Sequence, residues 1–292
     1  MPDVLKTIFN VLVLVFVLSS MFDLGLGLTI KQIVAPLKNV PLIAKALVAS
    51  FVLVPLLAFA LAQVIGLEQQ LAIGLFIMGV AAGSPMVVKL SQIAKGDMAY
   101  TAGLMVLLQF VTILVAPFML TLLLDSVEVD ALSLTQSLII TMLLPLVVGL
   151  FVNSRYPALA QIVSPYLKQG ASVTLMMQAV LGLFLGAGDL LALVGTGAFL
   201  AAILFGILTL AIGYLLGGAD QETRIVTGLS TSQRNVAAAL LIMIQNFDEP
   251  TVIVMVLMTA VVMLVLGSIA AGEFGRRAAS PEPVLEAASV KS

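Results

Sequence analysis

Long apolar stretches separated by short polar segments fill almost the whole chain. A transmembrane helix needs about 20 predominantly apolar residues, and nine stretches reach that length, at residues 7–28, 40–64, 70–94, 98–124, 133–153, 167–187, 192–217, 222–246 and 250–272. Turn-forming and charged residues fall between them, at 31–39, 66–70, 125–130, 153–165 and 217–221. The pattern predicts an all-α polytopic membrane protein with nine transmembrane helices.

Composition supports this fold class and excludes several functions. Of 292 residues, 61% are hydrophobic and 10% are charged, which is outside the range of soluble domains. The chain has no Cys and no His, so it lacks the usual ligands for zinc or haem and the common nucleophile pairs. We expect no enzymatic activity and no cofactor. The net charge of -2, without a basic run, argues against a nucleic-acid partner.

The basic residues between the apolar stretches are distributed asymmetrically. Nine spans place ten Lys and Arg residues near one side of the membrane and only Lys6 near the other. By the positive-inside rule, the ten-residue side is cytoplasmic. We expect the N-terminus outside and the C-terminus in the cytoplasm, in a plasma or bacterial inner membrane. The ten residues are Lys31, Lys38, Lys45, Lys95, Arg155, Lys168, Arg224, Arg276, Arg277 and Lys291.

Residues 228–239, GLSTSQRNVAAA, interrupt the eighth span with six consecutive polar side chains. An arginine at the centre of a bilayer costs roughly 2.5 kcal/mol or more, and the polar neighbours compete for backbone hydrogen bonds. A helix break is tolerated there only if protein buries it or a wet cavity lines it. The stretch predicts a transport site that includes Ser230, Thr231, Gln233, Arg234 and Asn235.

The third span has a second interruption, at residues 83–85. Pro85 removes a backbone donor and disfavours helix at Ser84, and Lys89 follows one turn later. Setting Asp97 against Asp248 brings this interruption opposite the one in the eighth span. Because the third and eighth spans are five positions apart in the chain, the two broken helices would run in opposite directions. That arrangement is typical of inverted-repeat transporters.

The domain organisation follows from this offset. Residues 1–277 would form one transporter unit, with a first repeat at about 7–124 and a second at about 167–272. The remaining residues, 278–292, are short and polar, and we expect a disordered cytoplasmic tail.

Four stretches carry a resemblance to a known family: GLGLTIK at 25–31, LAIGLFIMGVAAGSP at 71–85, AKGDMA at 94–99 and STSQRNVAAAL at 230–240. In this order and spacing they resemble the bile acid:sodium symporter family. The resemblance implies a core domain with two crossing discontinuous helices, a panel domain, and a substrate cavity between the two domains. The third and eighth spans would be the crossing helices.

The same resemblance implies sodium sites, and here the chain departs from the family pattern. Val87 and Val88 stand where the family has a serine–asparagine pair. Ser230 and Arg234 stand where it has a glutamate and a glutamine. The remaining differences are Met105 for a hydroxyl ligand and Ser50 near the position of a glutamine. Candidate sodium ligands that are kept are Thr101 and Asn235, with Ser230 as a third; the coupling ion, Na⁺ or H⁺, stays open.

Cationic side chains offer one replacement for bound sodium. Lys89 and Arg234 would place fixed positive charge near the crossing and attract an anion, with Asp23 as a counter-ion or proton carrier. Alternatively, Lys89 snorkels to the headgroups, and Arg234 with Asp23 is a structural tie. Hydroxyls such as Ser84 commonly cap helix ends in membranes. Gln109, Gln136 and Gln178 are interpreted as contacts between helices.

The function that these observations favour is secondary active transport of a small or medium organic anion by alternating access. Helix N-termini at the two breaks would offer amide donors and the positive ends of helix dipoles to the anion. A passive facilitator or channel, or a sensor on the same fold that does not transport, are the alternatives. The partners would be the substrate and the lipid bilayer, and the oligomeric state is open.

Overall fold

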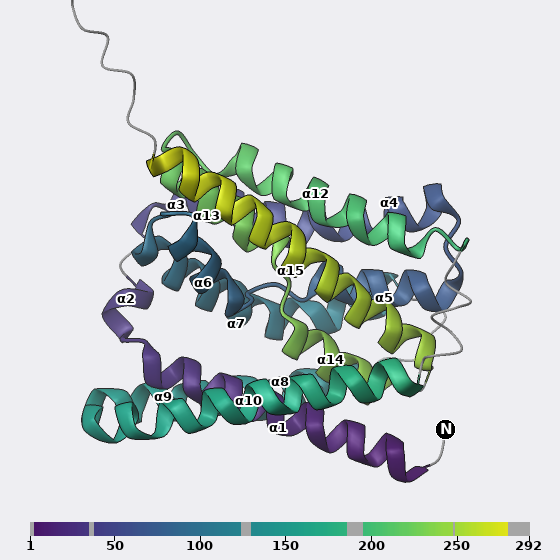
Figure 1. The fold of residues 1–292 in the computed structure, drawn as a ribbon, viewed down its shortest axis with the longest axis horizontal. Helices are drawn as coiled ribbons and strands as arrows, with labels where there is room; N and C mark the ends of the chain where they lie inside the picture. The colour runs from purple at the N-terminus through teal and green to yellow at the C-terminus, as the bar shows by residue number, and fades with distance from the viewer. Residues whose placement is uncertain (1–2, 35–37, 124–129, 186–194, 248, 280–292) are drawn as a thin grey trace, which may run out of the picture.

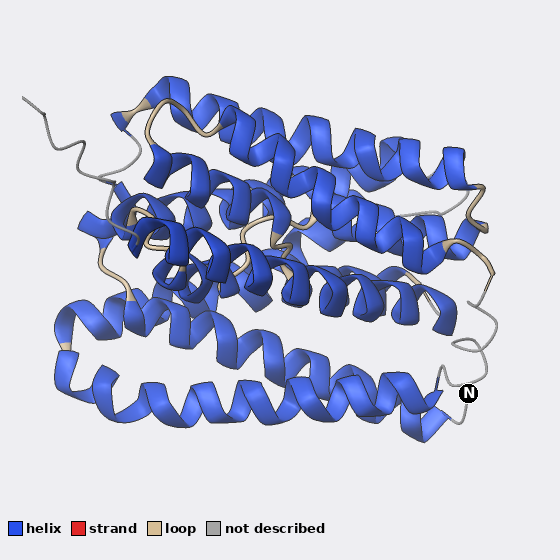
Figure 2. Cartoon of the chain, turned by 45° about the horizontal axis from the view of Figure 1, so that its top comes forward, coloured by secondary structure: helices blue, strands red, loops and turns tan. Residues whose placement is uncertain are grey.

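A computed structural model describes residues 3–34, 38–123, 130–185, 195–247 and 249–279. Over these residues the regular structure is entirely helical (Figure 2). Six helical stretches in the described part are long and apolar enough to cross a membrane. They are α1 (Asp3–Gly27), α3–η2–α4 (Val40–Val48, Ala49–Leu53, Val54–Ile65), α7 (Met98–Leu123), α8–η3–α9 (Ala131–Leu138, Ile139–Leu143, Leu144–Arg155), α12 (Ala198–Leu216) and α15 (Pro250–Ala279).

Two further pairs of helices are interrupted, each within a predicted span. The first pair is α5 (Gln69–Val80) and α6 (Met86–Ile93), and the second is α13 (Gln221–Ser232) and α14 (Val236–Asn246). A short helix, α2 (Ile30–Val34), follows α1. Figure 1 shows the two interrupted pairs in the middle of the molecule, between the outer helices.

One predicted connection is wrong. Residues 153–165 were expected to link two spans, but α9 continues to Arg155 and α10 runs over Pro157–Leu185, which leaves Tyr156 as the link. Proline suits the first position of a helix, because its missing N–H would have no partner there anyway. Pro165 lies inside α10 and removes a single helical bond, which membrane helices tolerate.

The end of the chain also differs from its predicted boundary. Helix α15 extends to Ala279, so the first two residues of the predicted tail are helical. Residues 280–292 lie outside the described part, as do Asp125 and Glu128 of the predicted connection before α8. Asp130 caps α8, and hydrogen bonds from the hydroxyl and N–H of Ser133 and the N–H of Leu132 lower the pKa of Asp130.

The helices pack in two groups. In the smaller group, α1 packs along α10 and α9, at the bottom of Figure 1. Glycines allow close contact there: a Cβ added at Gly25 would lie 2.2 Å from the backbone oxygen of Leu146. In the larger group, α12 packs on α13 and α15, and α15 packs on α5. This grouping places both interruptions inside the larger group.

Candidate functional site

The two interruptions touch each other through Asn235. Its backbone N–H donates to the carbonyl of Ala81 at 2.8 Å, and its side-chain Nδ2 donates to the carbonyl of Gly83 at 3.1 Å. Its Oδ1 accepts from the N–H of Ala238 at 3.1 Å and so caps α14. Asn235 is fully buried. Asn235 therefore both caps α14 and ties its N-terminus to the first interruption.

The first interruption is held open by backbone geometry and by α7. Gly83 has a φ of +82°, and a Cβ on it would lie 2.3 Å from the backbone nitrogen of Gln109. The hydroxyl of Thr112 accepts from the N–H of Ala82 at 2.9 Å and lies 3.1 Å from the carbonyl of the same residue. The Ala82 N–H is therefore diverted from the helical bond that would continue α5.

Arg234 projects from the second interruption into a ring of backbone carbonyls. Its Nε donates to Met78 at 2.9 Å, Nη1 to Thr231 at 3.4 Å, and Nη2 to Ser50 at 3.3 Å and to Gly79. Only 2% of the residue is exposed. All four partners are neutral oxygens, and no carboxylate of the described residues forms a salt bridge with this guanidinium.

Two of these carbonyls are available because their usual helical partner points elsewhere. Residue i+4 from Met78 is Ala82, whose N–H goes to Thr112. Residue i+4 from Thr231 is Asn235, whose N–H goes to Ala81. The breaks in the two helices thus create the acceptors that the guanidinium binds.

The Ser50 carbonyl is free for a different reason. Ser50 lies in the π-helical segment η2, where the N–H of Val54 bonds to Ala49 instead of Ser50. The next residue, Pro55, has no N–H to offer, so the Ser50 carbonyl lacks a partner in its own helix. A π-helical turn at a functional position is a recurrent feature of proteins, and the sequence analysis did not predict this one.

Gln233, a predicted site residue, and its neighbour Ser232 bond to helices other than those of the first interruption. Gln233 Nε2 donates to the carbonyl of Met263 on α15 at 2.7 Å, and the hydroxyl of Ser232 donates to Gly206 on α12 at 3.4 Å. These bonds fix α13 to its neighbours. The hydroxyls of Ser230 and Thr231 are buried and have no hydrogen-bond partner within the described part of the chain.

The remaining predicted residues are spread over the molecule. Asp23 accepts from the hydroxyl of Ser164 on α10 at 2.5 Å, so the expected ion pair with Arg234 is not formed. Thr101 donates to the carbonyl of Asp97 in its own helix at 2.7 Å. The hydroxyl of Ser84 accepts from the N–H of Met86 at 3.4 Å, at the start of α6. Lys89, on the same helix, is exposed and has no partner among the described residues.

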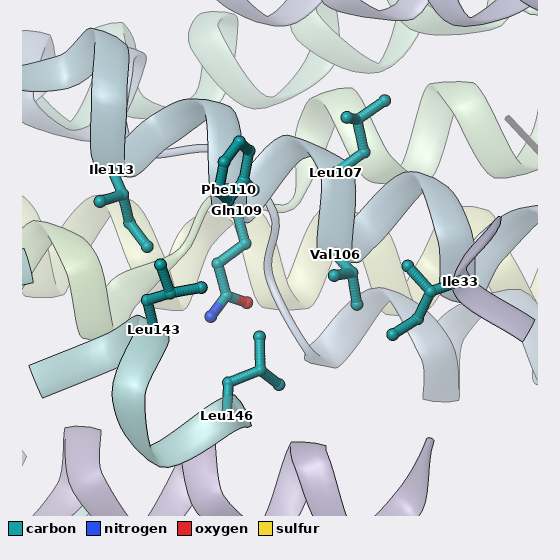
Figure 3. Close-up of a pocket in the computed structure, with 8 residues that line it drawn as sticks. All are labelled: Ile33, Val106, Leu107, Gln109, Phe110, Ile113, Leu143 and Leu146. Atoms are coloured by element: carbon teal, nitrogen blue, oxygen red, sulfur yellow. The ribbon is translucent and has the colours of Figure 1, made fainter. Parts of the chain in front are cut away.

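A cavity of about 250 Å³ lies between α7 and the segments η3 and α9. Its lining is apolar except for Gln109, whose amide points toward Leu143 and Leu146 (Figure 3). Gln109 is fully buried, its Nε2 contacts the sulfur of Met21, and its Oε1 has no partner. The sequence analysis interpreted this residue as an interhelical contact, and the structure adds that it lines a cavity. The other lining residues are Ile33, Val106, Leu107, Phe110 and Ile113.

The cavity lies beside the first interruption, and a hydrophobic cluster connects it to α6. Gln109 contributes the backbone nitrogen that Gly83 approaches. Val88 of α6 packs in the same hydrophobic cluster as Val106 and Leu146, which line the cavity. Lys89, the neighbour of Val88, is therefore the exposed cation of the element beside the cavity. The sequence pointed to Lys89, and the family resemblance implied a cavity between two domains, but neither predicted the residues that line it.

Two comparisons relate the sequence of this chain to known proteins. The probable sodium/metabolite cotransporter BASS1, chloroplastic, of Arabidopsis thaliana is 26% identical over 221 residues, which are 74% of this chain and 55% of the relative. The chain thus spans about half the length of that relative. The model of the Sodium Bile acid symporter family matches residues 11–193, more than half of the chain. This protein, with its two interrupted helices in contact at their breaks, belongs to the Sodium Bile acid symporter family.

Proposed function

We propose that this protein is a secondary active transporter of a small organic anion that works by alternating access. The observation that carries the proposal is the contact between two interrupted helices, break to break, inside a membrane protein of this family. Transporters commonly handle substrate where discontinuous helices meet near the bilayer midplane. The name of the Arabidopsis thaliana relative, a sodium/metabolite cotransporter, is in keeping with such a role.

The proposed architecture divides the helices by how they pack. The panel domain would contain α1, α8–α9 and α10, and the core domain would contain the remaining long helices and both interrupted pairs. Counting α10 and the two interrupted pairs as crossings adds three spans to the six apolar ones and gives nine. The first repeat would cover about 7–124 and the second about 167–272, within one transporter unit.

The arrangement of charges supports the proposed orientation. In Figure 1, α2, α3, the end of α6 and the end of α15 lie toward the left, and the N-terminus lies at the right. The basic residues of these elements, including Lys31 and Arg276, thus gather at one end of the molecule, which we assign to the cytoplasmic side of a plasma membrane. Lys6, in the first turns of α1, lies toward the other end.

The proposed substrate site is the cavity between the two groups of helices. Its apolar lining would hold the body of the substrate, and Gln109, the polar side chain of that lining, would orient a donor group. The exposed ammonium of Lys89 and the N-terminus of α6 would attract the negative charge. A cavity of about 250 Å³ is smaller than most ligand pockets, so it favours a small acid over a steroid-sized one.

Uptake of labelled organic acids into proteoliposomes tests this function. Wild-type protein is expected to accumulate at least one small acid above its outside concentration when an ion or counter-substrate gradient is imposed. Gln109→Leu is expected to reduce the rate at least ~10-fold, because it removes the polar group of the cavity. Gln178→Leu is the matched control, since Gln178 is equally buried but lies on α10 outside the cavity, and its uptake is expected to equal that of wild type.

Two outcomes would contradict the proposal. Flux that only equilibrates the acid, whatever gradient is imposed, would indicate a passive facilitator. Equal loss in Gln109→Leu and Gln178→Leu would mean that buried amides matter for folding and that the cavity does not hold substrate.

A further inference from the structure

The ring of carbonyls around Arg234 is a cation site by its chemistry. Met78 and Gly79 belong to the last turn of α5, and Thr231 belongs to the last turn of α13. The C-terminus of a helix carries partial negative charge. In transporters with discontinuous helices, unwound carbonyls and the C-terminal ends of half-helices coordinate the coupling sodium ion or proton. Here the oxygens of that kind converge on a guanidinium.

Hydrogen-bond geometry, as well as charge, holds the guanidinium in place. Arg234 uses Nε, Nη1 and Nη2, and its four acceptors come from three separate elements: α5, α13 and the π-helical segment η2. The planar, five-donor group of arginine suits several fixed acceptors, whereas lysine is a point charge. Nearly complete burial leaves no route for exchange with solvent in this conformation.

The other position at which the sequence suggested sodium is apolar in the structure. Val87 and Met105 are buried side chains of one hydrophobic cluster. The hydroxyl of Thr101 is already bonded to the carbonyl of Asp97. Hard cations bind oxygen ligands, and this region offers a sodium ion neither a carboxylate nor a free hydroxyl from these residues.

We infer that Arg234 is a built-in cation that permanently occupies the cation position between the two breaks, so that the protein binds its substrate and transports it without sodium. The statement about transport without sodium rests on the proposed function, whereas the statement about the cation position concerns cation binding alone. Arg234 then acts as a positioning residue: it joins α5, α13 and η2 at the point where other members of a sodium-coupled family would need an ion. Substrate charge would be met by Lys89.

Removing the guanidinium should convert the site into one that binds sodium. Arg234→Gln would leave the carbonyls of Met78, Gly79 and Ser50 facing a shortened side chain. The buried hydroxyls of Ser50 and Thr231, whose carbonyls belong to the ring, have no partner among the described residues and would be additional oxygens. A ligand that binds only the folded state raises the unfolding temperature. Sodium sensitivity should therefore appear in the variant and be absent from wild type.

The experiment measures the unfolding temperature of the full-length, detergent-purified protein in sodium, potassium or choline chloride at equal ionic strength. Wild type is expected to unfold at the same temperature in all three salts. Arg234→Gln is expected to unfold about 5–10 °C lower in choline and to regain part of the loss in sodium. Arg224→Gln is the matched control, since Arg224 lies on α13, which ends just before Arg234, and stacks on Tyr214 outside the carbonyl ring, with 4.4 Å from Cζ to the ring centroid. It should show no salt preference.

Wild-type protein decides the question even if Arg234→Gln does not fold. Specific stabilisation of wild type by sodium, or an uptake rate that rises several-fold with an inward sodium gradient, would overturn the inference. A variant that folds, is destabilised and ignores sodium would also overturn it, because the carbonyl ring would then not be a cation site. If no acid is taken up by wild type under any gradient, the proposed function fails, while the unfolding temperatures still decide on the cation position.

Discussion

The breaks in the two interrupted helices present opposite hydrogen-bonding groups to each other. The break between α5 and α6 is made by backbone: Gly83 adopts a left-handed φ, Pro85 starts the next helix, and the segment offers carbonyl oxygens. The break between α13 and α14 is made by side chains, because Arg234 and Asn235 supply donors. Each break satisfies what the other leaves open. Burying either one alone would leave unpaired polar groups in an apolar interior, which costs several kcal/mol in lipid.

The comparison shows why the two halves cannot be exchanged. A pair of breaks with the same residues would present acceptors to acceptors or donors to donors. Here one half offers backbone carbonyls and a close backbone approach to α7, and the other offers a cation and an amide. The contact is therefore complementary, and its parts can be tested separately.

Gly83→Ala should have the largest effect, because it disturbs the backbone of the first break, which forms one side of the contact. The left-handed φ of +82° costs alanine about 1 kcal/mol, and the new Cβ would press on the backbone of Gln109, 2.3 Å away, for a further 1–3 kcal/mol or so. We expect the free energy of unfolding in detergent to fall by about 3 kcal/mol, together with loss of uptake.

Substitution of a second glycine separates the conformational contribution to this loss of stability from the steric contribution. Gly66, at the end of α4, has a similar φ of +74° but no atom within 4 Å of an added Cβ. Gly66→Ala should therefore lose only the backbone term, about 1 kcal/mol. Equal losses at both positions would show that conformation alone matters at Gly83 and that its approach to α7 contributes nothing.

Asn235→Ala removes a side chain of the second break from the contact and should have an intermediate effect. The variant loses the cap of α14, worth about 1 kcal/mol, and the bond to the carbonyl of Gly83, worth about 0.6 kcal/mol in a membrane protein. The expected total is roughly 1.5 kcal/mol or more in chemical unfolding. Asn39→Ala is the control, because Asn39 caps α3 in the same way but is exposed and makes no contact between helices. A loss at Asn39 as large as that at Asn235 would contradict the crossing contact.

The sequence predicted the breaks better than it predicted their chemistry. Pro85 and the polar run before Asn235 are local signals, since each conflicts with a continuous apolar helix, and the structure interrupts both helices there. The partner of Arg234 is a long-range feature. Asp23 was a reasonable expectation because carboxylates pair with buried cations, but carbonyls freed by the breaks satisfy the guanidinium instead.

Other features had no local signal. The free carbonyl of Ser50 depends on a π-helical turn before Pro55, and a proline alone does not distinguish a turn from a kink. Gln109 looked like any single amide in an apolar span, and its role at the cavity depends on which helices lie opposite. The long α10 was divided in the prediction because Pro165 resembled a connection, although proline is accepted within membrane helices.

Thr112→Val gives the smallest and most specific test of the asymmetry between the breaks. The variant keeps the shape of the side chain but loses the hydroxyl that holds the N–H and the carbonyl of Ala82. The Ala82 N–H can then return to the carbonyl of Met78, which would compete with Arg234 for that oxygen. We expect a loss of only ~0.5–1 kcal/mol in unfolding, with a measurable fall in uptake because the break would tend to close. Thr209→Val is the matched control: Thr209 is also buried, but its hydroxyl bonds only to carbonyls of its own helix, so both stability and uptake should change little. If Thr112→Val lowers stability without affecting uptake, the hydroxyl serves folding alone, and the first break keeps its shape through Gly83 and Pro85.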